Sequence, residues 1–241
     1  MPGVWIDQTF AGFDMAAFEA LGSLQCDTLT LIAKIFTSMG AVPYIILMAL
    51  MGLIMCFFKK TRKIGFALMF SVIIGTLVTN ILVKPMVGRL RPYVTLAENS
   101  QFMSWYRAAG ALTESDKCFP SGHTTGAMEI ATALLLCHAT SKKKGARAVC
   151  WIFPLIAIAV AASRVYLMVH YATDVLAAMI VGVFAGIFGF LLSKAACAIF
   201  NTSKEQRQLA AGEHLRGGVR FMIALGWLVA FGVAFLYIML Q

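Results

Sequence analysis

Long apolar runs, separated by short polar stretches, dominate the chain from residue 29 onward. A helix that crosses a lipid bilayer needs roughly 20 predominantly apolar residues. Six segments reach about that length, and we expect each of them to be a transmembrane helix. They are residues 29–57, 64–83, 122–141, 149–169, 174–200 and 219–240. The pattern therefore predicts an all-α integral membrane protein, in which residues 1–241 form a single domain built as a six-helix bundle.

The N-terminal part departs from this regular series. The segment 29–57 is longer than one bilayer crossing needs, and we expect Gly40 and Pro43 to break or kink it, because proline disrupts a helix interior. Within residues 10–24, apolar side chains recur at helical spacing with acidic residues between them. That spacing is typical of a short helix lying in the membrane interface, and it fits an ordinary packed N-terminal helix equally well.

The composition agrees with a membrane protein. Of the 241 residues, 60% are hydrophobic and 13% are charged, whereas a soluble domain carries about 25% charged residues. The formal net charge of +9 could by itself suggest a nucleic-acid partner. The basic residues instead lie in short runs between apolar segments, where they set the orientation of a membrane protein. We therefore expect membrane lipids, and no nucleic acid, as partners.

The basic runs also predict which side of the membrane each loop faces. Most lysines and arginines lie at residues 59–63, 142–147 and 194–220. Short loops rich in lysine and arginine stay in the cytoplasm. Both termini and the intervening segments 84–121 and 163–174 then face outward.

The outer side holds one long connection and two cysteines. The connection, residues 93–119, has the length of a lid or a binding element, and a flexible outer loop explains it equally well. The six cysteines are scattered, whereas a zinc site needs clustered ligands. We therefore expect no metal site and no cofactor. Cys26 and Cys118 both fall on the outer side, where a disulfide could form.

Ionisable and polar residues gather at the outer ends of the predicted spans. Such residues at membrane depth are costly and usually mark a functional site. Arginine and lysine side chains suit the oxygens of a phosphoryl group, and a helix that begins near Gly122 would add free backbone N–H groups. The positions concerned are, in chain order, Lys84, Arg91, Pro92, Pro120, Ser121, Gly122, His123, Ser163, Arg164, His170 and Asp174.

In order and spacing, these positions resemble the three-part signature of the type-2 phosphatidic acid phosphatase family. The parts read Lys-x6-Arg-Pro, Pro-Ser-Gly-His and Ser-Arg-x5-His-x3-Asp, and the match runs from Lys84 to Asp174 without a departure. The same superfamily contains glucose-6-phosphatase and the vanadium haloperoxidases. One Pro-Ser-Gly-His would be a weak signal, but the three parts together are specific.

The resemblance implies a role for each of three catalytic residues. His170 would be the nucleophile and would form a phosphohistidine. Asp174 lies four residues further on, on the same face of a helical turn, and would hold one ring nitrogen protonated while aiming the other. His123 would protonate the leaving group and then activate the water that cleaves the intermediate.

The remaining motif residues would bind the phosphate oxygens and stabilise the charge that shifts onto them. They are Lys84, Arg91, Ser121, Gly122, Ser163 and Arg164. With these cations no metal is needed. Taken singly, each cation would be read as a snorkelling residue at the membrane boundary, and the joint pattern favours the site. Three further basic residues belong to no motif, and we interpret them as solvated charges: Arg89, Arg107 and Lys117.

The sequence therefore predicts a membrane lipid phosphatase with an outward-facing site. Its substrate would be undecaprenyl diphosphate or a related lipid phosphate, such as phosphatidylglycerol phosphate or phosphatidic acid. A phosphotransferase of the same fold, which passes the phosphate to a lipid or sugar, is an alternative. A transporter of anions or lipids is a further one, but transport has no use for a nucleophile with its acid.

One acid lies within a predicted span. Glu129 follows Gly122 by seven residues and Thr125 by four, so the three share a helix face. We consider two interpretations: Glu129 points toward the site and pairs with Lys84 or Arg91, or it bonds to a hydroxyl group on a neighbouring helix.

Overall fold

The computed structural model describes residues 2–114, 116–141 and 144–202. Within these ranges the chain is helical and contains no β-strand, which confirms the all-α class. The predicted last span, residues 219–240, lies outside the described residues. The bundle of six therefore stays a prediction.

The first predicted span is two helices. Helix α2 (Asp27–Ser38) and helix α3 (Val42–Cys56) meet at an angle of 41°. The break falls at Gly40, and Pro43 lies in the first turn of α3, where its missing N–H group leaves no helical bond unmade. The predicted kink is thus confirmed.

The second predicted span is continuous but changes its winding. Helix α4 (Arg62–Thr76) passes into a π-helical segment, η1 (Leu77–Val83), and then into the short helix α5 (Lys84–Val87). Gly88 ends α5 with a φ of 66°, a left-handed conformation that glycine adopts at little cost. The helix therefore ends one turn after Lys84, and the motif residue Arg91 follows the turn at Gly88.

Helices α8 (Gly122–Ala139), α10 (Ile152–Tyr166) and α11 (Ala172–Thr202) complete the bundle, and the short helix α9 (Lys144–Val149) joins α8 to α10. Helix α11 packs along both α4 and α8. Helix α8 is the most buried of the long helices, and it is less hydrophobic than its neighbours because several of its buried residues are polar. These include Thr124, Thr125, Glu129 and Thr132.

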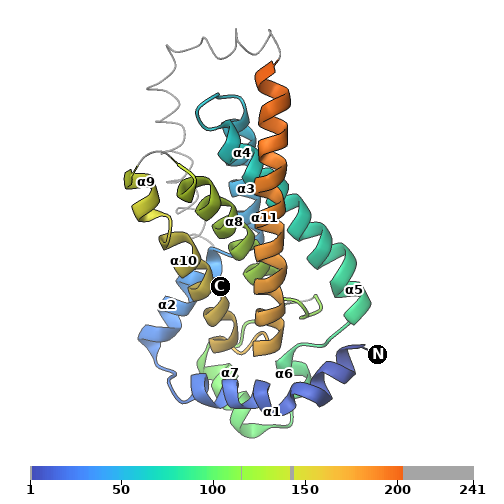
Figure 1. Ribbon diagram of the computed structural model, residues 1–241. Coiled ribbons are helices and arrows are strands. Elements are labelled where there is room, and N and C mark those ends of the chain that lie inside the picture. Colours follow the sequence, from blue (N-terminus) through green and yellow to red (C-terminus); the bar gives the residue numbers. More distant parts are fainter. Residues whose placement is uncertain (1, 115, 142–143, 203–241) are drawn as a thin grey trace.

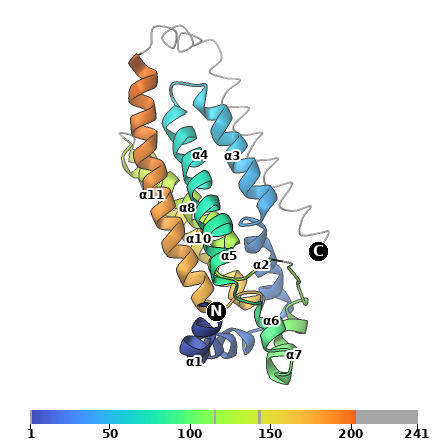
Figure 2. The ribbon, with the colours of Figure 1, turned by 90° about the vertical axis from the view of Figure 1, so that its right-hand side faces the viewer.

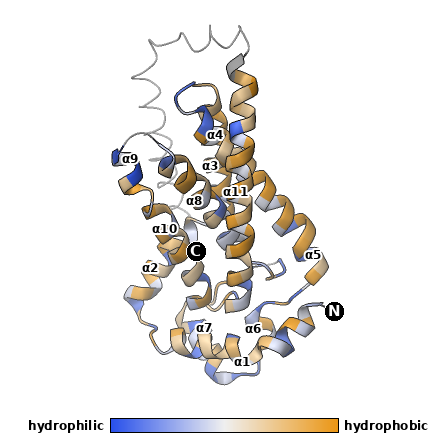
Figure 3. Cartoon of the chain, in the orientation of Figure 1, coloured by the Kyte–Doolittle hydropathy of each residue, from blue (hydrophilic) through white to orange (hydrophobic). Residues whose placement is uncertain are grey.

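Within the described residues, three helical stretches are long and apolar enough to cross a membrane, and the bent pair α2–α3 is a fourth. The three are Arg62–Thr95, Arg147–Tyr166 and Ala172–Phe200. Helix α8 does not reach the same hydropathy, since it lies inside the bundle rather than against lipid. Figure 3 shows the long helices coloured mainly as hydrophobic, with hydrophilic residues gathered toward their ends.

The bundle has two different ends (Figures 1 and 2). At the site end lie α1 (Pro2–Gly22), α6 (Pro92–Thr95) and α7 (Ser100–Ala108). At the basic end lie residues 59–63 and α9. The predicted separation of the basic runs from the motif segments therefore holds for the described residues, while the assignment of each end to a side of the membrane stays a prediction.

Helix α1 packs against the site end. Phe18 is fully buried there, with its ring centroid 4.9 Å from that of Phe102 and 5.7 Å from that of Tyr171. The N-terminal helix expected from the sequence is thus present and packed, and its place in the membrane interface stays a prediction. The outer connection 93–119 is not a plain loop, since it contains α7 and most of α6.

Candidate active site

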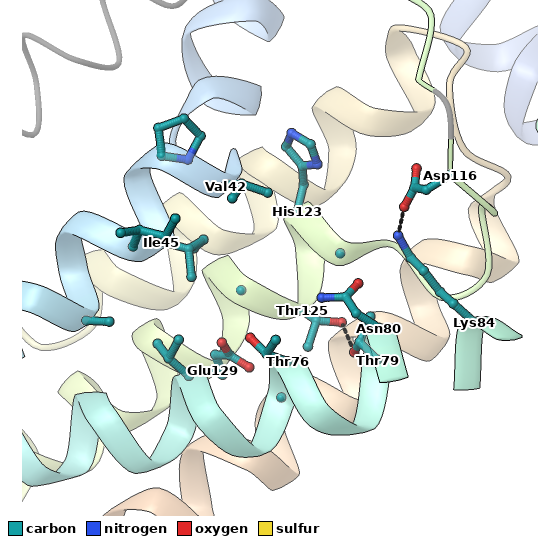
Figure 4. A pocket seen from close by; sticks show the side chains of 18 of the residues that line it. Val42, Ile45, Thr76, Thr79, Asn80, Lys84, Asp116, His123, Thr125 and Glu129 are labelled. Atoms are coloured by element: carbon teal, nitrogen blue, oxygen red, sulfur yellow. Dashed lines mark hydrogen bonds and ion pairs between the residues drawn. The ribbon is translucent and has the colours of Figure 1, made fainter. Parts of the chain in front are cut away.

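The three motif segments meet at the site end. Lys84 opens α5, Arg91 directly precedes α6, and His123 lies in the first turn of α8. His170 lies in the connection between α10 and α11. All four side chains, together with Gly122, line one cavity, part of which Figure 4 shows. The structure therefore brings together residues that are up to 86 positions apart, from Lys84 to His170.

His170 is held between a carboxylate and a guanidinium group. Its Nδ1 lies 3.3 Å from Oδ2 of Asp174, and its Nε2 lies 2.7 Å from an Nη atom of Arg91. A guanidinium group can only donate, so Nε2 must accept and Nδ1 must carry the proton that faces Asp174. The nitrogen beside Arg91 is thus the one that carries the lone electron pair.

The short connection that carries His170 has a fixed conformation. Leu167, Met168 and Val169 are fully buried, and Met168 has a φ of 58°, which is uncommon for a residue other than glycine.

Burial, followed by the nearby charge of Arg91, lowers the pKa of His170 well below its usual value. The imidazole is therefore neutral at neutral pH, as a nucleophile must be.

Two carboxylates of the connection between α7 and α8 lie on the cations of the site. Glu114 pairs with Arg91 at 2.5 Å and also with Arg164, and Asp116 pairs with both Lys84 and Arg91. Burial alone would raise the pKa of Glu114, but Arg164, His123 and Arg91 together lower it to about 2. Lys84 and Arg91 likewise lower the pKa of Asp116. Both acids are therefore ionised, and they pair with the cations that the motifs assign to phosphate binding.

Three motif residues lie behind the cavity wall rather than in it. Ser121 caps α8, where its hydroxyl oxygen accepts from the backbone N–H of Thr124 at 3.4 Å. Ser163 donates its hydroxyl to the carbonyl of Val160 at 2.6 Å, within its own helix. Arg164 donates to the hydroxyl of Thr37 at 2.6 Å and reaches the site through Glu114. Neither serine is among the residues that line the cavity, and their contact with phosphate stays a prediction.

The break in the first span is shaped around His123. A Cβ atom on Gly40 would lie 2.7 Å from the carbonyl oxygen of His123 and 2.9 Å from its Cβ atom. Real side chains do not approach so closely, so the α2–α3 junction can pack on the start of α8 only with glycine there. This junction thereby forms one wall of the cavity.

Arg89 is buried, and its interpretation as a solvated charge is wrong. Only 1% of its surface is exposed, and it forms ion pairs with Asp7, Asp14 and Asp174. Burying a charge costs several kcal/mol unless partners compensate for the lost water, and these carboxylates do so. A sequence signal existed: Asp7 and Asp14 are seven residues apart and so lie on one face of α1.

The cavity continues from the site into the apolar part of the bundle. Its volume is about 970 Å³, within the range of ligand-binding pockets. Beyond His123 it runs between α3, α4 and α8, and its far part is lined by apolar residues. These include Ile46, Ala49, Leu50, Leu53, Met69 and Ile73.

Glu129 lines the same cavity, near Thr76 in Figure 4. Its side chain is buried, and Oε2 has no hydrogen-bond partner among the described residues. No ion pair joins it to Lys84 or Arg91 in that part of the chain, since both cations bind the acids of the outer connection. Of the two interpretations, the pairing with Lys84 or Arg91 is therefore wrong, although the side chain does line the cavity.

The described residues contain neither a group suited to a metal ion nor a bond between Cys26 and Cys118. In the part of the chain that the structure describes, no group of at least three histidine, cysteine or acidic residues is placed to hold a metal ion. Cys26 is exposed and Cys118 is buried, and both are free. The Cys118 thiol donates instead to the carbonyl of Leu90, so the disulfide considered from the sequence is not formed.

Comparison with known proteins supports what the motifs imply. The sequence model of the PAP2 superfamily matches residues 64–198. The chain belongs to this superfamily. The match includes every motif position, from Lys84 to Asp174. The apolar helices agree with the transmembrane character of a solved PAP2 relative.

Two relatives of this PAP2 protein are equally identical to it in sequence. The bacitracin transport permease protein BcrC of Bacillus licheniformis is 30% identical over 61% of this chain, and the alignment covers 66% of that relative, just under two thirds of its length. The undecaprenyl-diphosphatase of Sulfolobus acidocaldarius is 30% identical over 71% of this chain and 74% of its own length.

A solved structure shares the fold of the PAP2 protein described here. It is the transmembrane PAP2-type phosphatidylglycerolphosphate phosphatase from Bacillus subtilis. The two chains superpose with a TM-score of 0.62 and are 25% identical, with 84% of this chain and 92% of that chain covered. The relatives named as phosphatases thus act on two different lipid phosphates, a polyprenyl diphosphate and a glycerophospholipid.

Proposed function

We propose that this protein hydrolyses the phosphate or diphosphate monoester of a membrane lipid through a phosphohistidine on His170. The observation that carries the proposal is the cavity, which has cations and two histidines at one end and apolar side chains at the other. A substrate that fills it must be amphipathic, with a phosphate group beside His170 and a hydrocarbon tail between α3, α4 and α8.

In the first step, Nε2 of His170 attacks phosphorus. The new N–P bond forms as the ester P–O bond breaks, and the electron pair of that bond leaves with the oxygen. His123 lines the same cavity and gives this oxygen a proton. Asp174 accepts the N–H of the other ring nitrogen, so it stabilises the positive charge that develops on the imidazole.

In the second step, water attacks the phosphohistidine. His123, now neutral, takes a proton from the water, whose oxygen bonds to phosphorus as the N–P bond breaks. Inorganic phosphate leaves, and His170 returns to its neutral form. Lys84, Arg91 and Arg164 stabilise the oxygens in both steps, once the phosphate has displaced the two acids of the outer connection. The Gly122 backbone N–H adds a donor at the start of α8.

The side of the membrane limits the choice of lipid. The positive-inside rule assigns the basic end to the cytoplasm, which puts the reacting phosphate at the outer leaflet. An undecaprenyl diphosphate exposed there ranks first, in agreement with the name of the Sulfolobus relative, an undecaprenyl-diphosphatase. Phosphatidylglycerol phosphate, the substrate named for the Bacillus subtilis structure, and phosphatidic acid rank behind it.

Phosphate release from a panel of these three lipids tests the proposal. The purified full-length chain should release phosphate from at least one of them, should remain active in EDTA and should be inhibited by vanadate. The same assay with a lipid or sugar acceptor distinguishes hydrolysis from phosphate transfer. Activity that is lost in EDTA and restored by a divalent ion would contradict the metal-independent mechanism.

The outward orientation has a separate test. Single cysteines placed in residues 93–119 and in residues 144–147 should react differently with an impermeant thiol reagent in intact cells. Labelling of the first set alone supports the proposed topology. Labelling of the second set alone would turn the site toward the cytoplasm and reverse the ranking of the lipids.

A further inference from the structure

Arg89 connects the N-terminal helix to the proposed catalytic carboxylate. Its Nε donates to Asp7 at 2.7 Å, and one Nη atom donates to Asp14 at 2.8 Å. The other Nη atom donates to Oδ1 of Asp174 at 2.5 Å. Asp7 and Asp14 belong to α1, whereas Asp174 lies in the first turn of α11. One buried guanidinium group thus bonds to two helices that are far apart in the sequence.

The backbone beside Asp174 is held by the same group of residues. Asp14 accepts from the backbone N–H of Thr173 at 2.9 Å and from its hydroxyl group. Arg89 also donates to that hydroxyl, at 2.8 Å, and its guanidinium carbon lies 3.6 Å from the centroid of the Tyr171 ring. Three residues in the five-residue segment from His170 to Asp174 therefore contact Arg89 directly.

The two oxygens of Asp174 have separate partners. Oδ2 faces Nδ1 of His170 at 3.3 Å and accepts from the backbone N–H of Tyr171 at 3.0 Å. Oδ1 binds Arg89. A carboxylate with a partner on each oxygen cannot rotate without breaking a charged hydrogen bond. The orientation of the oxygen that faces His170 is consequently fixed from the opposite side by Arg89.

We propose that Arg89 is a positioning residue for the nucleophile, and that Asp14 of α1 in turn positions Arg89. The guanidinium group holds the Asp174 carboxylate ionised and correctly rotated, so that Nδ1 of His170 keeps its proton and Nε2 faces the phosphate. This inference rests on the proposed function of His170 and Asp174. It adds that the N-terminal helix is part of the catalytic unit and not only a cover on the bundle.

A purely structural role is the alternative to be tested. A salt bridge that only attached α1 to the bundle would need Asp7 and Asp14 alone. The shortest of the three ion pairs of Arg89 is instead with Asp174. If Arg89 acts through Asp174, it has nothing left to position once that carboxylate is replaced. A double-mutant cycle measures such a dependence directly.

The experiment compares Arg89→Gln, Asp174→Asn and the double variant in steady-state kinetics with a lipid phosphate. Arg89→Gln should lower kcat by about 10- to 100-fold with little change in KM. A loss of this size is usual when a residue that orients a functional side chain is removed. The double variant should be no more than about threefold slower than Asp174→Asn alone. Arg89→Lys should recover part of the rate, because it restores the charge with fewer donors.

Arg62→Gln is the matched control, since it removes another buried arginine, at the basic end. Arg62 is 5% exposed and donates to the carbonyl of Cys56 at 2.9 Å. Its loss should change thermal stability without changing kcat. Independent losses that multiply in the Arg89→Gln, Asp174→Asn double variant would overturn the inference, as would an Arg89→Gln enzyme with wild-type kcat.

Asp14→Asn keeps the experiment decisive if Arg89→Gln does not fold. The amide has the same shape and still accepts from Thr173, but it removes one of the charges that hold Arg89. We expect a kcat about 3- to 10-fold lower and an unchanged KM, a smaller loss than the one expected for Arg89→Gln, because Asp14 acts on Asp174 only through Arg89. A change in stability alone would overturn the inference. An active His170→Asn variant would instead refute the proposed function on which it rests.

Discussion

The two ends of the bundle differ in the partners of their positive charges. At the site end, the cations Lys84, Arg89, Arg91 and Arg164 are buried, and each pairs with at least one carboxylate. At the basic end, Lys59 and Lys60 are exposed, and Lys63 donates to the hydroxyl of Thr140. Arg62 is buried there, but its bond is to the carbonyl of Cys56 and not to a carboxylate. No ion pair with a carboxylate forms there among the described residues.

The difference shows which positive charges need a partner within the fold. An exposed lysine keeps its water and needs no partner, so a run of them can orient the chain at little cost. A buried cation loses several kcal/mol of hydration, and it persists only where partners or ligands compensate. The number of basic residues in a segment therefore does not locate the site. Buried cations that pair with carboxylates do locate it.

The largest expected difference between the ends concerns His170. Replacing it with asparagine removes the only proposed nucleophile, so turnover should fall below detection. Phosphoenzyme from a labelled lipid phosphate should be trapped in the wild type and should be absent in His170→Asn. His138, which lies toward the basic end and bonds to the carbonyl of Leu134, provides the control, because His138→Asn should retain phosphoenzyme formation.

A change of equal charge at each end gives the next comparison. Lys84→Gln should lower kcat/KM by about 100- to 1000-fold, the usual loss when one donor to a developing oxyanion is removed. Lys60→Gln should leave kcat/KM within about twofold, as surface substitutions usually do. Both are measured with the same lipid phosphate in the same detergent. Equal losses would mean that the burial of a cation does not distinguish the site.

The acids that cover the cations should have a smaller and opposite effect. A phosphate must displace Glu114 and Asp116, so the Glu114→Gln, Asp116→Asn double variant should bind vanadate more tightly. We expect a Ki about tenfold lower, which corresponds to about 1.4 kcal/mol. Glu98→Gln, an acid on the same connection but outside the cavity, is the control. A higher Ki would show that the acids assist binding instead of competing with it.

Much of the fold and the site followed from the sequence because the signals were local. The break at Gly40 and Pro43 follows from backbone chemistry. Each motif segment lies at the end of an apolar run. Successive spans cross the bilayer in opposite directions, so the order of the spans predicts that Lys84, His123 and His170 lie at the same end of the bundle. The lower hydropathy of α8 was missed, because a helix covered by other helices needs no apolar surface for lipid.

The parts that the sequence did not predict depend on long-range packing. Arg89 is surrounded by charges from α1 and α11, and nothing within its own segment indicates this. Glu114 and Asp116 bind the cations only because α6 and α7 fold back over the site end. Ser163 bonds to its own helix, an i−3 contact that motif spacing does not reveal.

The smallest expected effect concerns Glu129, which is buried like the cations of the site but has an oxygen without a partner. It borders the part of the cavity proposed for the lipid tail, so an isosteric, neutral Glu129→Gln should change KM by about threefold or less for a polyprenyl diphosphate, within the usual range of a single neutral hydrogen bond. A glycerophospholipid, whose ester carbonyls lie close to its phosphate, should be affected more.

Gly75→Ala is the companion change, because a Cβ atom there would collide with the Glu129 carboxylate. It should raise KM for both lipids through steric crowding. The comparison then distinguishes the effect of cavity volume on KM from the effect of the Glu129 carboxyl group. If Glu129→Gln instead lowers kcat more than tenfold for both lipids, Glu129 takes part in the reaction. An unpaired buried acid would then mark the site as clearly as the paired cations do.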